Sequence, residues 1–140
     1  GQDVVRFSDF NGSGNGARIM IIDNIGMLSS AYRYAHIAVI GGGFGKGIHN
    51  ILEAACWGIP VVFGPNHKKF REAVEMIAAG GAGTYSNYDD FRRIIDGWLA
   101  DENSYRLSAG NALEYVRKNT GATNVIMSKL NMKDMNKSFS

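Results

Sequence analysis

The stretch "AVIGGGFGKGIHNILEAACWGIPVVFGP", from Ala38 to Pro65, decides the fold. An apolar run ends in five glycines within seven residues, and His49, Asn50 and Glu53 follow the glycines. A second apolar run, from Pro60 to Phe63, comes after a short helical pattern that a glycine ends. Strand, helix and strand in this order predict a βαβ unit with parallel strands.

The same alternation continues on both sides of this stretch. Arg18 to Asp23 is apolar on nearly every residue, which predicts a strand buried on both faces. The other predicted strands are Val4–Phe7, His36–Ile40 and Gly83–Tyr85; the predicted helices are Met27–Ala35, Asn50–Trp57, Phe70–Ala79, Asp89–Leu99, Ser104–Asn119 and a tail from Thr123 to about Leu130. This order predicts an α/β fold, a Rossmann-like three-layer α/β/α arrangement around a parallel sheet. Ligands bind such sheets beyond the carboxyl ends of the strands.

Length and composition describe a globular chain and exclude several classes of protein. The chain has 140 residues, of which 45% are hydrophobic and 20% charged, so we expect one domain over residues 1–130 and a frayed polar tail over 131–140. The formal net charge of +2 is too small for a general nucleic-acid binder. No run is long enough to span a membrane, and no signal peptide is present. Cys56, the single cysteine, is expected to be a small buried side chain in a reducing compartment.

The glycine segment, residues 41–47, matches neither common phosphate-binding motif. Its glycines do not fall at the offsets of the dinucleotide fingerprint, and Gly47 stands where a P-loop needs a hydroxyl. Bare backbone after a buried strand still lets a ligand approach, and the following helix directs N–H groups and its positive dipole end to the same place. Lys46 would add a positive charge. The alternative is that the glycines only turn a corner.

Asn50 and Glu53 also have two interpretations. Asn at a helix start with Glu three residues later is the pattern of a capping box. A carboxylate in the first turn of a helix also suits the two hydroxyl groups of a nucleotide ribose. The spacing favours neither interpretation. His49, beside the candidate phosphate site, would donate to a phosphate or to a neighbouring carbonyl group.

The combined motifs resemble the C-terminal half of the 3-deoxy-D-manno-octulosonic acid (Kdo) transferases. The family pattern is Gly-Gly, a short loop, His-Asn-x-Leu-Glu, Gly-x-Pro-Val, Gly-Pro and Phe-x-Glu. This chain has it in order at Gly41–Gly42, His49–Glu53, Gly58–Val61, Gly64–Pro65 and Phe70–Glu72. An upstream segment, "IIDNIGMLSSAYRYAHIAVIGG", is similar to a second family segment. Met27 stands where the family usually has Glu, and Ala54 where Pro is common.

The resemblance implies the C-terminal, donor-binding domain of a GT-B glycosyltransferase that transfers Kdo from CMP-Kdo to the lipid A precursor of lipopolysaccharide. The family's other half, an N-terminal acceptor domain, carries the catalytic base and is absent from this chain. The resemblance therefore implies no catalytic residue here, an inactive chain alone, and its own N-terminal domain as a partner. It also implies a full-length protein at the cytoplasmic face of the inner membrane, attached through the missing half.

The residues carried over are those that match the two CMP-contacting segments of the family. They are Gly26, Met27 and Leu28 in the upstream segment, and Asn50, Ile51, Leu52 and Glu53 at the helix start. Lys46 and His49 are added from the electrostatic argument above. We expect no cofactor and no metal ion, because His36, His49 and His67 lack ligand spacing.

Two other functions remain open on the sequence. One is the donor domain of another GT-B enzyme that uses a UDP-sugar, and the other is a non-catalytic nucleotide-binding or partner-docking module. Lys68, Lys69 and Arg71 form a basic cluster, which is either a solvated helix start or a surface for anionic lipid. Asp89 and Asp90 are expected to face the dipole of the helix they begin.

Overall fold

The computed structural model describes residues 3–12 and 16–119 of the chain, in two compact units, residues 1–31 and 32–140. The helical tail predicted from Thr123 and the frayed tail predicted over 131–140 lie outside the described residues. The single domain predicted over residues 1–130 stays a prediction.

The first unit is a parallel pair of short strands with two short helical turns. It contains β1 (Val4–Arg6), a 3₁₀ turn at Phe7–Asp9, β2 (Ile19–Ile21) and α1 (Leu28–Ala31). The register pairs Val4 with Ile19. Polar bonds connect the two strand segments: the Ser8 amide donates to Asp23 at 3.1 Å, and Arg18 pairs with Asp3 at 2.7 Å.

The prediction that the strand at Arg18–Asp23 is buried on both faces is wrong. Ile19, Met20 and Ile21 are 54%, 45% and 47% exposed. A pair of three-residue strands forms no second layer of its own, so the apolar side chains of β2 have no partner face within their unit.

The second unit contains a three-stranded parallel sheet in the order β3–β4–β5. The strands are β3 (Ala38–Ile40), β4 (Val61–Phe63) and β5 (Ala82–Thr84), and the register pairs Ala38 with Val61 and Val61 with Ala82. The helices are a 3₁₀ turn, η2 (Tyr32–Tyr34), then α2 (Leu52–Ala55), α3 (Arg71–Ala78), α4 (Tyr88–Ala100) and α5 (Glu102–Lys118). The predicted α/β class with parallel strands is confirmed.

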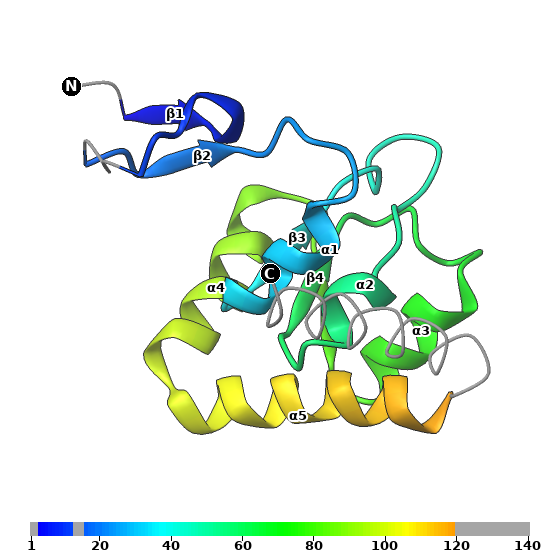
Figure 1. The fold of residues 1–140 in the computed structure, drawn as a ribbon. Helices are drawn as coiled ribbons and strands as arrows, with labels where there is room; N and C mark the ends of the chain where they lie inside the picture. Colours follow the sequence, from blue (N-terminus) through cyan, green and yellow to red (C-terminus); the bar gives the residue numbers. More distant parts are fainter. Residues whose placement is uncertain (1–2, 13–15, 120–140) are drawn as a thin grey trace. The chain divides into compact units, whose positions relative to one another are not determined.

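The core of this unit surrounds β4, the central strand. Val61, Val62 and Phe63 are completely buried, as their continuous apolar run predicted. The long helix α5 contacts α2, α3 and α4 (Figure 1) and adds Ala112 and Val116 to the core. β3 differs from β4, because Val39 is 53% exposed between two buried neighbours. A strand at the end of this sheet order therefore buries only one of its two faces.

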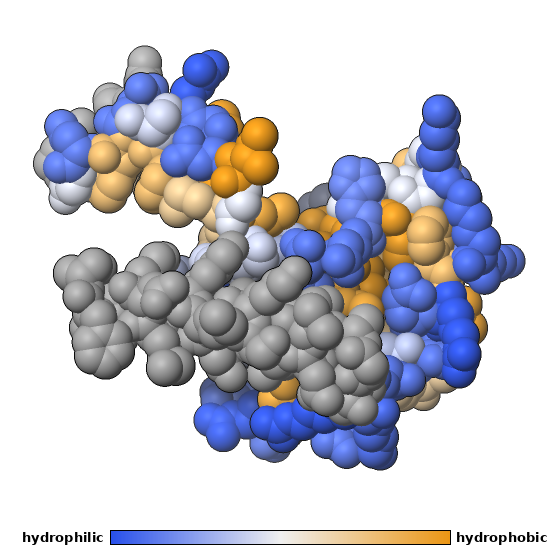
Figure 2. All heavy atoms as spheres, turned by 45° about the vertical axis from the view of Figure 1, so that its right-hand side comes forward, coloured by the Kyte–Doolittle hydropathy of each residue, from blue (hydrophilic) through white to orange (hydrophobic). Residues whose placement is uncertain are grey.

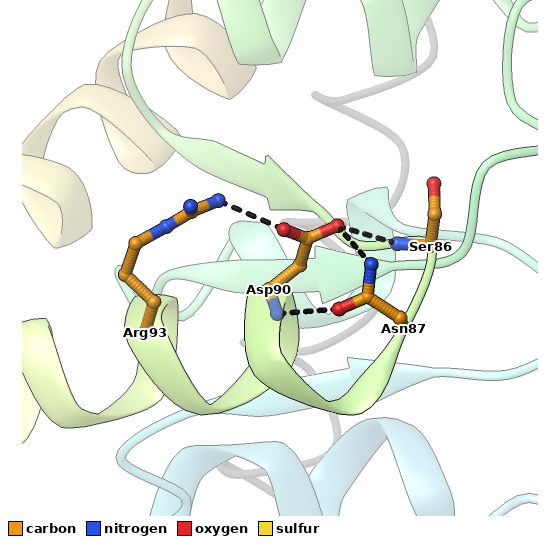
Figure 3. Close-up of polar contacts among 4 residues, drawn as sticks. All are labelled: Ser86, Asn87, Asp90 and Arg93. Atoms are coloured by element: carbon orange, nitrogen blue, oxygen red, sulfur yellow. Dashed lines mark hydrogen bonds and ion pairs between the residues drawn. The ribbon is translucent and has the colours of Figure 1, made fainter.

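Helix α4 begins with a complete polar cap, shown in Figure 3. The Asp90 amide donates to Asn87 Oδ1 at 2.9 Å, and the Asp90 carboxylate accepts from Asn87 Nδ2, the Ser86 amide and Arg93, at 3.1–3.3 Å. Asp90 therefore serves the helix start, as predicted.

Two findings concern the expectations drawn from composition. Cys56 is 4% exposed, as expected for a small apolar side chain. Within residues 3–12 and 16–119, no helix has the length and apolar character needed to cross a bilayer.

Candidate functional site

The candidate site is built from two loops that leave the carboxyl ends of neighbouring strands. The first, residues 41–51, follows β3, and the second, residues 64–70, follows β4. Three hydrogen bonds join them. The Asn66 backbone amide donates to the Gly43 carbonyl at 2.9 Å, the Asn66 side chain donates to the Gly45 carbonyl at 2.7 Å, and Lys69 Nζ donates to the Lys46 carbonyl at 2.6 Å. The two loops thus form one surface at the edge where parallel α/β sheets bind ligands.

Close packing accounts for three of the five glycines. A Cβ atom at Gly43 would lie 2.5 Å from the Gly64 nitrogen. Gly42 has φ of 87° and Gly47 has φ of 145°, values that strain any side chain. Gly41 and Gly45 are different: a Cβ atom would meet nothing within 4 Å at Gly41, and only a carbonyl at 3.8 Å at Gly45. Room for a ligand therefore lies at these two positions.

Three amides of this loop donate within the loop itself and are not free for a ligand. The Gly45 and Gly47 amides both donate to the Gly42 carbonyl, at 3.0 and 3.2 Å. The His49 amide donates to the Gly41 carbonyl at 3.0 Å. The loop thus uses these donors to hold its own turn.

The helix after the loop is also shorter than predicted. The predicted helix covered residues 50–57, whereas α2 has four residues, Leu52–Ala55. The macrodipole is a sum over aligned peptide units, so one turn supplies little of it. The dipole contribution expected at this site is therefore small, and positive charge has to come from side chains.

Asn50 and Glu53 lie together at the start of α2. Asn50 Oδ1 accepts from the Leu52 amide at 3.0 Å, and Asn50 Nδ2 donates to Glu53 Oε1 at 3.3 Å. Ile51, immediately before α2, makes no side-chain hydrogen bond to the helix, so Asn50, one residue earlier, caps it. Glu53 does not complete the reciprocal capping box, in which its carboxylate would accept from the backbone amide of the cap residue.

The cap of α4 offers a comparison within the same molecule. There Asn87 and Asp90 have the same spacing as Asn50 and Glu53, but the Asp90 carboxylate accepts from three groups, one of them an arginine. Among the described residues, the Glu53 carboxylate accepts one side-chain hydrogen bond, from Asn50. A carboxylate has about four lone-pair sites, so Glu53 keeps the acceptor capacity that two ribose hydroxyl groups need.

Ile51 and Leu52, which lie between Asn50 and Glu53, mainly hold the helix start in place. Ile51 as a whole is 1% exposed and belongs to the core, so almost none of its surface is open to a ligand. Leu52 is half-buried, and its amide is held by Asn50.

Lys46 and His49 are both exposed on the first loop. The His49 ring lies against Gly42, where a Cβ atom would meet its Cδ2 at 2.7 Å. Gly26, Met27 and Leu28 lie in the first unit, where Gly26 has φ of 85° and Leu28 begins α1. The Asn24 side chain donates to Met27 Sδ at 3.6 Å. That these three residues meet the same ligand as Asn50–Glu53 stays a prediction.

Glu53 influences two neighbouring groups. Burial, followed by the negative charge of Glu53, raises the pKa of Tyr32, which precedes β3 in the second unit. Burial also raises the pKa of the Cys56 thiol to about 11, with a smaller contribution from Glu53. Cys56 is therefore a protonated core side chain that donates to the Glu53 carbonyl at 3.3 Å, and it does not have the low pKa of a nucleophile.

The structural roles of Asn66 and Lys69 are not predictable from the sequence. Both follow the Gly64-Pro65 pair, and in the sequence Lys69 belongs to a basic cluster with Arg71. Arg71 instead pairs with Glu75 at 2.6 Å. No one-dimensional signal distinguishes these roles, because the partners of Asn66 and Lys69 are backbone carbonyls 21 and 23 residues away.

Among the described residues, no three His, Cys, Asp or Glu side chains are grouped so as to hold a metal ion. The expectation that the protein uses no metal stays a prediction.

The fold and the site define a class of protein: a parallel α/β domain with a candidate ligand site at the carboxyl ends of β3 and β4. Its fold is also that of a solved structure, the C-terminal CMP-Kdo binding domain of WaaA from Acinetobacter baumannii. The TM-score is 0.65 and the identity 23%, over 81% of this chain and 60% of that one. This likeness confirms the predicted fold.

Sequence comparison gives the family. No protein-family model matches the chain. The chain is 41% identical over 66 residues to the 3-deoxy-D-manno-octulosonic acid transferase of Aquifex aeolicus (strain VF5), covering 46% of this chain and 19% of that protein. It is 34% identical over 104 residues to the same transferase of Rickettsia typhi, covering 72% and 22%. The chain is related in sequence to the 3-deoxy-D-manno-octulosonic acid transferases, as its motifs predicted, and spans about a fifth of the length of these relatives.

Proposed function

We propose that this chain is the donor-binding part of a Kdo transferase and that it binds CMP-Kdo at the carboxyl ends of β3 and β4. In the whole protein, the bond between the Kdo anomeric carbon and the CMP phosphate breaks, and an acceptor hydroxyl forms the new glycosidic bond with inversion. The catalytic base and the lipid A precursor belong to the N-terminal half, through which the protein associates with the inner membrane.

The proposal rests on the unused hydrogen-bond acceptor sites of the Glu53 carboxylate. Its carboxylate lies in the first turn of α2 and accepts one side-chain hydrogen bond among the described residues, from Asn50. The corresponding acid of α4, Asp90, is fully used by its own cap. Glu53 is thus held in place by Asn50 and has acceptor sites left for a ribose. Its position after the glycine loop fits the CMP-contacting segment that the family motif implies.

The other matched residues have narrower roles. Asn50 caps α2 and holds the Glu53 carboxylate, so it positions the ribose acceptor. Ile51 and Leu52 keep the helix start against the core. Gly26 and Met27 contact the nucleotide mainly through their backbone, and Lys46 and His49 face its charged groups.

The test is calorimetric titration of CMP into this chain and into Glu53→Gln, with UMP as the competing nucleotide. Loss of the charged acceptor should weaken CMP binding by about tenfold, because a hydrogen bond to a charged group contributes about 1.5 kcal/mol. The matched control is Glu75→Gln, since Glu75 lies on α3 and bonds Arg71 and Tyr115. Equal CMP affinity in wild type and Glu53→Gln would reject the ribose assignment. Tighter binding of UMP than CMP would favour a UDP-sugar donor.

A further inference from the structure

We propose that the hollow between the loops after β3 and β4 is an oxyanion site, in which Lys46, Lys68 and Lys69 hold a phosphate group. The inference deepens the proposed function, on which the choice of organic phosphates below rests. The anion site itself is independent of any nucleotide.

The hollow has a volume of about 550 Å³, and it is lined by residues of both loops: Gly45, Lys46, Pro65, Asn66, Lys68 and Lys69. Three of the six are lysines, and none is acidic. Figure 2 shows hydrophilic side chains projecting on the side of the second unit where, in Figure 1, these loops lie.

Within the described part of the chain, the lysines of the hollow form no ion pair with an acidic side chain. The ion pairs found among the described residues involve Arg18, Arg71, Arg92, Arg93, Arg106 and Lys118. The three lysines of the hollow take part in none of those pairs. Like charges gathered in this way repel one another and oppose folding. A bound anion would relieve that repulsion. Surface lysines scattered among acidic residues would not need such an anion.

The two loops that form the hollow are also fixed to each other by hydrogen bonds. Lys69 Nζ donates to the Lys46 carbonyl at 2.6 Å, and its ammonium lies 5.4 Å from the centre of the Phe70 ring. The Asn66 side chain holds the Gly45 carbonyl at 2.7 Å. Lys46 and Lys68 are exposed, and they belong to the two different loops.

A phosphate fits this arrangement better than a carboxylate. Three ammonium groups match a group with close to two negative charges and three acceptor oxygens, and lysine binds phosphate as a point charge. The one-turn helix α2 supplies little dipole, so these lysines are the main source of positive charge on the candidate site. Gly45 leaves space for the anion on the loop side.

The direct test uses inorganic phosphate and pyrophosphate as probes, at constant ionic strength set with chloride. Amide chemical shifts of the chain should move at residues 43–47 and 66–70, and the apparent Kd should rise roughly tenfold or more in Lys46→Gln/Lys68→Gln. Lys118→Gln, an exposed lysine on α5, is the control and should bind as wild type does. Equal affinity in the double variant and the control would overturn the proposal. Lys69 is left unchanged because its side chain also supports the loop.

A melting experiment separates loss of binding from loss of fold. Pyrophosphate should raise the Tm of wild type and of Lys118→Gln, and leave the Tm of the double variant unchanged. Without ligand, the double variant should melt no lower than wild type, because two repelling charges are gone. An equal rise of Tm in all three proteins would overturn the proposal.

Further titrations identify the source of the phosphate. CMP is compared with cytidine, and N-acetylglucosamine 1-phosphate with N-acetylglucosamine. If the double variant weakens CMP alone, the site holds the nucleotide phosphate; if it weakens the sugar phosphate alone, the site holds an acceptor-type phosphate. If the double variant binds both CMP and the sugar phosphate as tightly as wild type does, the assignment of the site to a substrate phosphate is overturned. Failure of the proposed function looks different: Glu53→Gln would leave CMP affinity unchanged while pyrophosphate binding still depended on the lysines.

Discussion

The side-chain amide of Asn50 donates to the carboxylate of Glu53 at 3.3 Å, while Asn50 Oδ1 accepts from the Leu52 amide at 3.0 Å. Asn50 is therefore the helix cap, and Glu53 is a group that the cap positions. The capping interpretation therefore holds for Asn50, and the ribose interpretation of Glu53 stays a prediction. Substitutions of the two residues should differ in their effect on stability.

Asn50→Ala should lower the free energy of unfolding by about 1 kcal/mol, the usual loss for a removed cap. Glu53→Gln should change it by less than about 0.5 kcal/mol, because a surface substitution outside a cap has a small effect. Urea denaturation of the two variants measures both values. Asn87→Ala, at the cap of α4, is the matched control and should resemble Asn50→Ala. A loss of stability in Glu53→Gln as large as in Asn50→Ala would make Glu53 part of the cap.

Gly43→Ala should destabilise the fold by about 1–3 kcal/mol, the usual cost of overpacking. The new methyl group would meet the Gly64 backbone at 2.5 Å, and backbone atoms have little freedom to move away. Gly110→Ala is the opposite case, since a Cβ atom there meets nothing within 4 Å on the exposed side of α5. That variant should gain about 0.5–1 kcal/mol from helix propensity. Thermal melts of both variants check the opposite signs, and equal signs would refute the packing argument.

Ser108→Ala should raise stability by up to about 1 kcal/mol. Ser108 is 5% exposed in α5, and its hydroxyl finds no hydrogen-bond partner among the residues that the structure describes. An unsatisfied buried hydroxyl costs about 1–3 kcal/mol, and alanine also has the better helix propensity. Ser104→Ala, one turn earlier and only half-buried, provides the control. A clear destabilisation of Ser108→Ala by chemical denaturation would show that the hydroxyl has a partner in solution.

The Cys56 thiol should make the protein less stable in alkali. Burial raises its pKa from 9.0 to about 11, so the unfolded chain releases this proton first as the pH rises. The contribution of Cys56 is therefore fully present below pH 9 and is lost between pH 9 and about 11. Urea midpoints measured across this range should fall less steeply for Cys56→Ala than for wild type. Parallel curves would contradict the shift, as would rapid alkylation of the native thiol under mild conditions.

Glu75 should make the fold less stable in acid. The Arg71 guanidinium at 2.6 Å, followed by the Tyr115 hydroxyl at 2.7 Å, lowers the pKa of its carboxyl below 4.5. The unfolded state therefore binds this proton first, and the stabilisation present above pH 4.5 is lost as the pH falls through the folded pKa. Glu75→Gln should flatten the acid side of the pH–stability curve measured by urea denaturation, and a curve as steep as that of wild type would contradict the lowered pKa of Glu75.

Periodicity and motif order predicted most of the fold. The apolar run of β4 and the glycines after α2 and α3 are local signals, and the elements lie within a few residues of their predicted bounds. Exposure was less predictable: Ile19, Met20 and Ile21 form a strand as expected, but they remain exposed. Burial depends on which other elements cover a strand, and no local pattern contains that information.

The candidate site was predictable where the signal was local. Asn50 and Glu53 could be found from their spacing alone. The length of α2 could not, because loop packing against the neighbouring strand ends leaves only one turn of the predicted helix. The roles of Asn66 and Lys69 depend on carbonyls more than 20 residues away, and only the paired strands bring those groups together.

The contact between Gly43 and Gly64 has a consequence for how this surface can evolve. Because the two loops meet backbone to backbone, neither glycine can be exchanged without moving the other loop, so the frame tolerates very few single substitutions. The Lys46 side chain stands outside that frame and is exposed. A change at Lys46 would alter what the loop meets without altering where the loop lies, whereas the Phe44 ring packs against the Tyr85 ring at 5.4 Å. Ligand preference can therefore change through one exposed residue while the framework beneath it stays the same.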